Sequence, residues 1–418
     1  MKSKPFGNVI SVKKLFYAFI ITIFLFGLIF NAIPRKPHYI LKNELVYEND
    51  HVKVVKTGQV RLLFANYIKK DRLYATEDHF IFSSQIGDDT FSQLGHFSKI
   101  NPTLQQRLRD FIGRSKIERF FRKNIADNQV IVLDSGTILV FYDHIYRSID
   151  GGRTYKSVFQ FDKNVFNPFH NGIAVDDDGI VYFGEYNCSK RPHKVRIFKG
   201  TNDGTKWEVC YEFPPGQIFH VHSIKYDSYR KRLWICTGDR NAESRLMYTD
   251  DKFTSVHVLG SGDQSWRIVS LIVEKDYLFW CSDNDNLGSN IYRFNLKTNR
   301  KEKLRFIGKP SYYSTKLSDG TLVISTTDEP ESSFSEKYRP RQTTEIWISK
   351  KGLHWYKIFQ LVHKSFQTAV GESRSSIVFP SGDVGTKFLF FSPQNTMQFD
   401  KSLQRFSIQW KADSTRKE

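Results

Sequence analysis

Two histidines separated by one residue stand out in the stretch "GQIFHVHSIKYD", where His220 and His222 alternate along an expected β-strand. Because every second side chain of a strand points to the same face, the two imidazoles lie on one face, one pleat apart. Such a pair can chelate a divalent metal, and His170 or Gln264 could complete the ligand shell. In the alternative interpretation, one histidine hydrogen-bonds to a neighbouring segment and the other faces solvent.

Further polar residues follow apolar strands of one recurring shape, as in "IVYFGEYN" (180–187), "RLWICTGD" (232–239) and "YLFWCSDN" (277–284), and another strand candidate precedes each of them. Neighbouring antiparallel strands alternate in direction, so the start of each first strand and the end of each second strand meet at one edge. This edge gathers candidate catalytic and substrate-binding residues. The candidate catalytic residues are His170, Glu185, Tyr186, His220, His222, Asp239, Arg267 and Asp283, and the candidate substrate-binding residues are Gln264, Trp266 and Tyr312.

Two kinds of polysaccharide chemistry fit these residue types. In an elimination, Arg267 or a metal would neutralise a uronate carboxylate while a histidine or tyrosine takes the acidified proton. In a hydrolysis, two carboxylates would flank the bond, and Glu185, Asp239 and Asp283 are the candidates. Each of these acids could instead cap a turn, so the sequence leaves both reactions open.

A repeated turn organises the chain that must position these residues. The segment "IYRSIDGGRTYKSVFQF" (145–161) aligns without a gap with "IFKGTNDGTKWEVCYEF" (197–213), and looser copies begin at Ile81, Leu246 and Ile346. Apolar and aromatic residues alternate on both sides of a glycine-containing turn, which is typical of a β-hairpin. The Asp150 side chain can accept hydrogen bonds from the amides of its turn.

The pattern Ser-x-Asp-x-Gly-x-Thr-Tyr in "SIDGGRTY" (148–155) resembles the Asp-box, or BNR, repeat of sialidase-like β-propellers. In that family the turn joins the two outer strands of a blade, so the resemblance implies a scaffold role for Asp150. The catalytic motifs of sialidases do not match this chain: only "AIPR" (32–35) echoes one of them, out of order. Some polysaccharide lyases are also propellers with His, Tyr and Arg at the mouth.

Counting these units predicts an all-β propeller of about seven four-stranded blades, near residues 60–97, 129–161, 168–213, 218–258, 267–305, 311–361 and 366–400. A strand around residues 51–60 is expected to pair with the last blade and close the ring. The predicted organisation is a cytoplasmic N-terminus (1–14), a transmembrane signal anchor (15–33), a stalk (34–44), the propeller (45–405) and a C-terminal tail (406–418).

The predicted anchor, Leu15–Ile33, has 19 residues without a charge, and Lys2, Lys4, Lys13 and Lys14 precede it. This length and this charge bias favour a single membrane-spanning helix with the C-terminal domain outside the cytoplasm. Within the propeller, residues 104–124 have apolar residues at helical spacing and seven Lys or Arg against two acids, which predicts a helical insertion. It packs on the propeller in one interpretation and contacts a membrane surface or an acidic polymer in the other.

Charge and cysteine content restrict the partners. Of the formal charge of +18, seven positive charges lie in residues 1–42, so the remainder carries +11. An outward-facing basic domain attracts anionic polymers or lipid headgroups, and its location argues against nucleic acid. The four cysteines are too scattered for a disulfide scaffold.

From these residues and this organisation we expect a carbohydrate-active propeller, a lyase or a glycosidase-like enzyme with one divalent metal. A non-catalytic propeller that binds a glycan or a protein in a polysaccharide assembly complex is the alternative.

Overall fold

The computed structural model describes residues 36–98, 128–162, 165–187, 193–284, 288–329, 342–364, 367–368, 371–372, 374–383 and 386–412, together with Tyr17, Phe19 and Thr22. Across these residues no helix has the length and apolar character needed to cross a membrane. The expected anchor lies outside the described residues, apart from the three named above. The expected helical insertion, 104–124, lies outside them as well.

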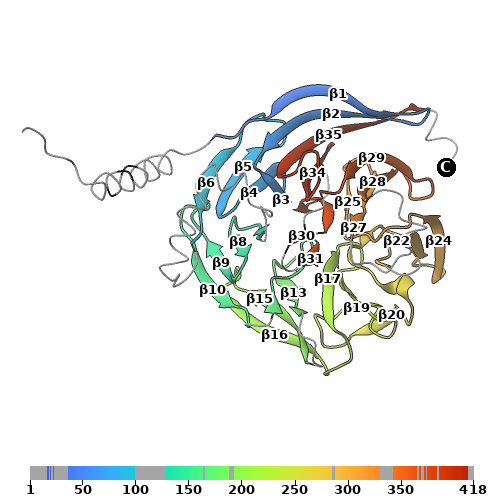
Figure 1. Ribbon diagram of the computed structural model, residues 1–418. Coiled ribbons are helices and arrows are strands. Elements are labelled where there is room, and N and C mark those ends of the chain that lie inside the picture. Colours follow the sequence, from blue (N-terminus) through green and yellow to red (C-terminus); the bar gives the residue numbers. More distant parts are fainter. Residues whose placement is uncertain are drawn as a thin grey trace, which may run out of the picture. The chain divides into compact units, whose positions relative to one another are not determined.

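The described strands from Pro37 onward form a seven-bladed propeller (Figure 1). Each of the first six blades has four antiparallel strands that run in sequence order from the centre outward. Blade 1 contains β3 (Phe64–Lys69), β4 (Arg72–Glu77), β5 (Phe80–Gln85) and β6 (Ser92–His96), and blade 2 contains β7 (Gln129–Val132), β8 (Ile138–Phe141), β9 (His144–Ser148) and β10 (Lys156–Gln160). Blade 3 contains β12 (Ala174–Val175), β13 (Val181–Gly184), β15 (Val195–Thr201) and β16 (Lys206–Phe213).

The next three blades repeat this order. Blade 4 contains β17 (His220–Asp227), β18 (Arg232–Gly238), β19 (Arg245–Thr249) and β20 (His257–Ser261). Blade 5 contains β21 (Ile272–Val273), β22 (Tyr277–Cys281), β23 (Asn290–Asn295) and β24 (Arg300–Phe306). Blade 6 contains β25 (Tyr313–Lys316), β26 (Leu322–Ser325), β28 (Thr343–Ser349) and β29 (Tyr356–Val362). Smaller pairings add β11 (Val165–Phe166) to β14 (Tyr186–Asn187), β30 (Gln367–Thr368) to β31 (Gly371–Glu372), and β33 (Ser381–Gly382) to β3.

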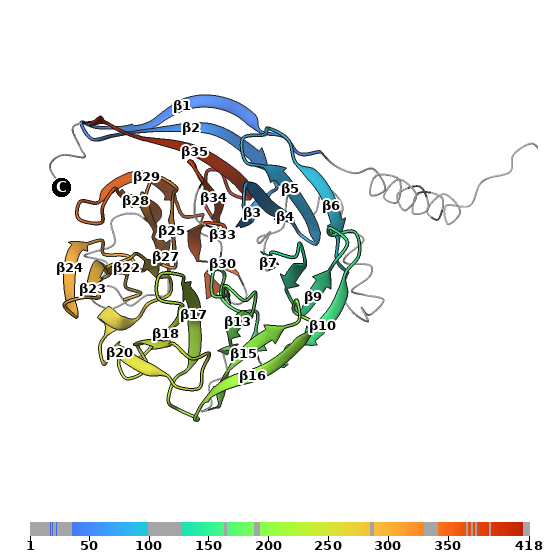
Figure 2. The ribbon, with the colours of Figure 1, turned by 180° about the vertical axis from the view of Figure 1, so that it is seen from behind.

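Blade 7 combines the two ends of the propeller sequence. Its inner strands are β32 (Ser375–Val378), which also pairs with β27 (Thr327–Asp328), then β34 (Phe388–Gln394) and β35 (Ser402–Trp410). The next strand outward is β2 (Val52–Arg61), which pairs with β35 in the register Val54↔Ile408, and β1 (Ile40–Glu48) covers β2. The predicted closing strand is therefore confirmed, and the strands extend beyond the expected limits of 45–405 at both ends. Figure 2 shows the closed ring from behind.

The core lies between blades, because each blade packs one face on each neighbour. The second strands β8, β13 and β26 are buried at every residue, which explains why they are apolar runs without alternation. Phe141 and Phe183 meet edge to face at 5.6 Å between blades 2 and 3. Burial of one such side chain contributes roughly 1.5–3 kcal/mol. Cys210, Cys236 and Cys281 are free thiols.

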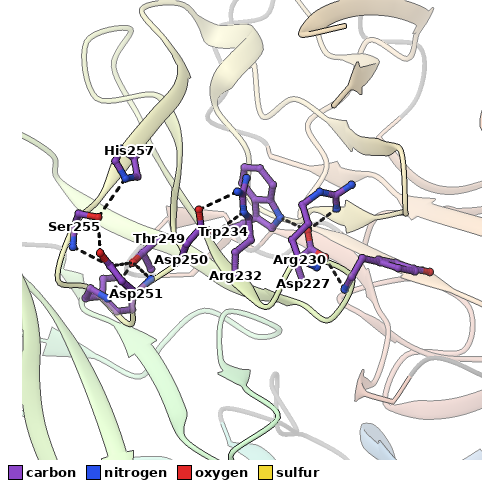
Figure 3. A network of polar contacts seen from close by, with 11 residues as sticks. Asp227, Arg230, Arg232, Trp234, Thr249, Asp250, Asp251, Ser255 and His257 are labelled. Carbon is purple, nitrogen blue, oxygen red and sulfur yellow. Dashed lines mark hydrogen bonds and ion pairs between the residues drawn. The ribbon is translucent and has the colours of Figure 1, made fainter. Parts of the chain in front are cut away.

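Two of the repeated turns are closed by aspartate side chains. Asp150 Oδ1 accepts hydrogen bonds at 3.0 Å from the backbone N–H groups of Arg153 and Thr154. In blade 4, Asp251 accepts from the backbone N–H and the hydroxyl of Ser255, at 2.9 and 2.6 Å (Figure 3). These bonds hold the pKa of Asp150 well below its usual range, led by the bond from the Thr154 hydroxyl. Asp150 thus acts within its own turn, as the motif predicts.

Candidate metal and carboxylate site

The paired histidines begin β17, the innermost strand of blade 4. Both are buried, with 3% of each residue exposed, and their ring centres are 4.8 Å apart. The pairing with β18 contains an irregularity between Val221 and Ser223, so His222 is an extra residue opposite β18. Such bulges re-aim side chains. The alternation of side chains along a strand predicted that the two rings share one face, and in the structure the rings lie next to each other.

Asp239 directly follows β18 and completes a cluster with these histidines. Its Oδ1 lies 3.5 Å from His220 Nε2 and 3.4 Å from His222 Nε2. One potential ligand atom from each of the three residues lies within 4.8 Å of the others, the only such grouping of His, Cys, Asp and Glu within the described part of the chain. Two imidazoles and one carboxylate make up a usual donor set for a divalent transition metal.

Hydrogen bonding and burial set the protonation states of the cluster. His222 Nδ1 lies 3.0 Å from the carbonyl oxygen of Ile268, to which it donates, and the other ring nitrogen, Nε2, faces Asp239. Burial lowers the pKa of His222. Burial also pushes the pKa of Asp239 upward, but its contacts with His220 and His222 outweigh burial and hold that pKa well below its usual range. The neutral imidazole of His222 and the ionised Asp239 are the forms that bind cations.

Two glycines let the strands approach closely enough to build this cluster. A Cβ at Gly238, the last residue of β18, would lie 2.5 Å from His222 Cε1 and 2.9 Å from Arg267 Cγ. A Cβ at Gly184 of β13 would lie 2.4 Å from Val221 Cβ. Any larger residue at either position would force the neighbouring side chain, or the strand that carries it, to move.

Arg267 links this cluster to blade 5. Its guanidinium lies 3.3 Å from Asp239 Oδ1 and 3.0 Å from Asp283 Oδ2. Asp283 is 2% exposed, and its backbone N–H donates to the Arg267 carbonyl oxygen at 2.9 Å. The structure therefore brings four of the sequence-predicted residues, His220, His222, Asp239 and Arg267, into direct contact, with Asp283 behind Arg267.

A second cationic group extends the same mouth. The Tyr186 ring stacks on His220 with centres 4.2 Å apart, and its hydroxyl hydrogen-bonds to Arg374. Arg374 also forms an ion pair with Glu329 at 2.9 Å, and the Tyr312 hydroxyl donates to the same carboxylate. The sequence analysis did not identify Arg374 or Glu329. A signal existed for Glu329, because it ends "TLVISTTDE", a strand of the same recurring shape.

Three residues that were predicted for the site make contacts outside the histidine cluster. His170 lies apart from the pair, edge-on to Phe64 with ring centres 5.4 Å apart, and its Nε2 is buried without a hydrogen-bond partner among the described atoms. Glu185 is occupied by Arg196, which donates to it from its backbone N–H at 2.8 Å and from Nε at 2.9 Å. Gln264 donates to the Asp239 carbonyl oxygen at 2.8 Å, so it holds the backbone beside the cluster.

Trp266 corrects the sequence prediction of a substrate-binding residue at the mouth. It ends the short 3₁₀ helix η1 (Gln264–Trp266), is 8% exposed and stacks on Trp280 with ring centres 5.5 Å apart. A Cβ at Gly260 would lie 2.2 Å from its ring. The indole therefore packs in the core between blades 4 and 5, because the turn of η1 directs it inward.

Comparisons with known proteins support the fold. No protein-family model matches the sequence, and no curated protein matches it. Among solved structures, an oligogalacturonate lyase in complex with manganese aligns over 92% of this chain and 100% of its own, at 8% identity and a TM-score of 0.57. An oligogalacturonate lyase from Vibrio parahaemolyticus aligns over 90% and 98%, at 11% identity and a TM-score of 0.55. At these identities the likeness shows a shared propeller fold.

Proposed function

We propose that this protein cleaves an acidic, uronate-containing polysaccharide by β-elimination, with one divalent metal bound by His220, His222 and Asp239. The observation that carries the proposal is the cluster of three ligand atoms within 4.8 Å, directly beside the guanidinium of Arg267. The manganese in the complex of a structurally similar oligogalacturonate lyase supports both the metal and the substrate class.

The residues present fit a divalent metal. The Nδ1–H group of His222 donates to the carbonyl oxygen of Ile268, which leaves Nε2 available for a metal. A hydrogen bond from the ring nitrogen that does not bind the metal is what usually orients a metal-binding histidine. A bound divalent cation would withdraw charge from a uronate carboxylate and make the proton on the adjacent ring carbon more acidic.

The chain's own residues supply the remaining roles. Arg374, whose side chain is 57% exposed, can bind a uronate carboxylate through its planar guanidinium. Tyr186 is the proton acceptor in this proposal, because its hydroxyl lies beside the guanidinium of Arg374, which would hold the uronate carboxylate. Removal of the C5 proton forms the C4–C5 double bond and breaks the C4–O bond, and the departing oxygen takes up a proton.

Elimination fits the carboxylates better than hydrolysis does. A hydrolase needs one protonated carboxylic acid beside one ionised carboxylate. Here Glu185 accepts hydrogen bonds from Arg196, Asp239 lies beside the two histidines, and Asp283 pairs with Arg267. All three predicted carboxylates are thus engaged by neighbouring side chains, which leaves none placed to deliver a proton to a glycosidic oxygen.

The test follows two products of the full-length protein on a panel of acidic polysaccharides, including polygalacturonate. Unsaturated uronate absorbance and reducing ends are expected to rise together, to fall after chelation with EDTA, and to return with Mn²⁺. A His220→Ala/His222→Ala variant should lose both signals, while His257→Ala, at an exposed histidine beside Ser255, should keep them. Reducing ends alone would indicate hydrolysis, and a folded, silent protein would favour the glycan- or protein-binding alternative.

The membrane location belongs to the same proposal. It rests on the charge-free run Leu15–Ile33 and its basic flank, and a tethered basic domain would meet polysaccharide outside the cytoplasm. Protease treatment of intact cells should digest the propeller if it lies outside, and protection of the propeller would contradict this orientation. The assignment of the Asp150 and Asp251 turns as Asp-boxes is likewise a proposal, supported by their hydrogen bonds.

A further inference from the structure

A second polar cavity lies at the other end of the central channel. β17 begins with the histidine pair and ends at Asp227, and Lys225 and Asp227 line a cavity of about 530 Å³. All seven blades contribute to its wall, for example through Tyr67, Asp134 and Asn171. With a rise of about 3.3 Å per residue, Lys225 is on the order of 10 Å along the strand from His222. The volume falls within the range of about 300–1,000 Å³ that is usual for small-molecule sites.

The acids that line this cavity are already engaged. Asp134 and Asp383 lie 3.0 and 3.7 Å from Lys69 Nζ. Asp227 accepts from Arg230 at 2.8 Å and from the Trp234 indole at 3.1 Å (Figure 3). Asp176 accepts the backbone N–H groups of its own turn, and Asp177 hydrogen-bonds to Tyr226. Asp134, Asp383 and Asp227 thus pair with cationic side chains, whereas Asp176 and Asp177, both on blade 3, are held by neutral donors.

Lys225 differs from the other lysines of the cavity wall. Lys316 Nζ lies 2.5 Å from Glu274, and Lys69 has the two partners named above. For Lys225 the residues that the structure describes provide neither an ion pair nor a hydrogen bond to its ammonium. Burial lowers its pKa, with no neighbouring charge opposing the shift. A partly buried ammonium without an anion costs folding free energy, so stability does not account for this lysine.

An acceptor without a partner lines the same cavity. Asn171 adopts a positive φ of 68°, a region uncommon for residues other than glycine. Its Nδ2 donates to the Phe379 carbonyl oxygen at 3.2 Å, which turns Oδ1 away from that contact. Oδ1 is buried and has no hydrogen-bond partner among the described atoms. A ligand that fits this cavity therefore brings an anionic group for Lys225 and a hydroxyl donor for Asn171.

We propose that this cavity is a second binding site, distinct from the histidine cluster, for a small carboxylate that carries hydroxyl groups, of the hexuronate class. The carboxylate accepts hydrogen bonds from Lys225, and a sugar hydroxyl donates to Asn171 Oδ1. The hydroxyl pair Ser270 and Ser314, 2.7 Å apart on neighbouring blades, offers further contacts. A phosphate dianion would also bind Lys225, but it has a single hydroxyl donor, whereas a hexuronate presents several around its carboxylate, which favours the hydroxy acid.

The test is calorimetric titration of the full-length protein in the His220→Ala/His222→Ala background, which removes the proposed metal site. The probes are sodium D-glucuronate, D-glucose and inorganic phosphate. Glucuronate should bind, glucose and phosphate should bind much more weakly, and Lys225→Met should weaken glucuronate about tenfold or more. The matched control is Lys350→Met, a lysine outside the cavity that is paired with Asp319.

A second variant guards against a folding defect. Asn171→Asp keeps the side-chain shape and tolerates the positive φ, and its charge should repel the carboxylate and reduce glucuronate binding to a similar extent. Lys225→Met should also leave the melting temperature equal or raised. Absence of glucuronate binding, binding that survives both substitutions, or equal binding of phosphate would overturn the proposal. None of these results depends on polysaccharide cleavage, so the two proposals fail separately.

Discussion

Oδ1 of Asp239 lies 3.4 Å from Nε2 of His222, although His222 belongs to β17 and Asp239 directly follows β18. The first strand brings the imidazole into the mouth, and the second strand ends just before the carboxylate. Antiparallel pairing of β17 with β18 places both at one edge. The cluster is thus a direct product of blade geometry.

Replacement of Asp239 by asparagine should weaken metal binding. The substitution keeps the shape but removes the charge that holds a divalent cation between the two histidines. Titration with Mn²⁺ should show an affinity loss of about tenfold or more, in the range seen when metal-site residues are changed. Asp178→Asn, at an exposed acid paired with Lys252, is the control and should bind Mn²⁺ normally. Equal affinities would remove Asp239 from the site.

A methyl group at Gly238 should damage the site through the histidine ring. The added Cβ would lie 2.5 Å from His222 Cε1, so the ring or the strand has to move, at a cost of about 1–3 kcal/mol. Gly200→Ala is the matched control, because its Cβ would meet the Trp207 ring at 2.5 Å, away from the cluster. Both variants should denature at lower urea concentration, but only Gly238→Ala should bind Mn²⁺ more weakly.

Removal of the Arg267 charge should leave the buried carboxylate of Asp283 without its cationic partner. Asp283 is 2% exposed, and loss of its partner in Arg267→Gln should cost about 3–5 kcal/mol of unfolding free energy. Adding Asp283→Asn should recover much of that loss, because no buried charge then remains. Urea denaturation of the two single variants and the double variant gives the coupling energy. Simple additivity would show that the pair contributes nothing to stability.

His170 should make the protein sensitive to mild acid. Burial lowers its pKa from 6.5 to about 4, so the folded state holds the neutral ring while the unfolded chain binds a proton below about pH 6.5. Its contribution to stability is complete above pH 6.5 and is lost as the pH falls through 4. Between pH 7.5 and 5 this amounts to about 2 kcal/mol. His170→Gln should show a smaller fall in urea midpoint over this interval, and parallel curves would contradict the assignment.

Much of the architecture could be predicted because it repeats. The apolar second strands and the Asp150 turn recur, so blade positions, blade number and the closing strand β2 followed from the sequence. The site was only partly predictable. Because His220 and His222 share a strand, the alternation of side chains was enough to predict that their rings lie close together. Their contact with Asp239 rather than with His170 depends on the bulge at His222 and on how blades 3 and 4 pack. Arg374 lies outside any repeated motif, so no pattern pointed to it.

The closure of the ring by β2 and β35 determines the order in which the chain can fold. Val54 pairs with Ile408, which the ribosome adds about 350 positions later. At synthesis rates of about 5–20 residues per second, β2 waits roughly 20–70 s for its partner. Blades 1 to 6 each draw their four strands from one continuous segment, so they can form in turn during this time. The nascent protein therefore emerges as an open arc with an unpaired β2 edge, and protection of that edge from other chains is a requirement of its biogenesis.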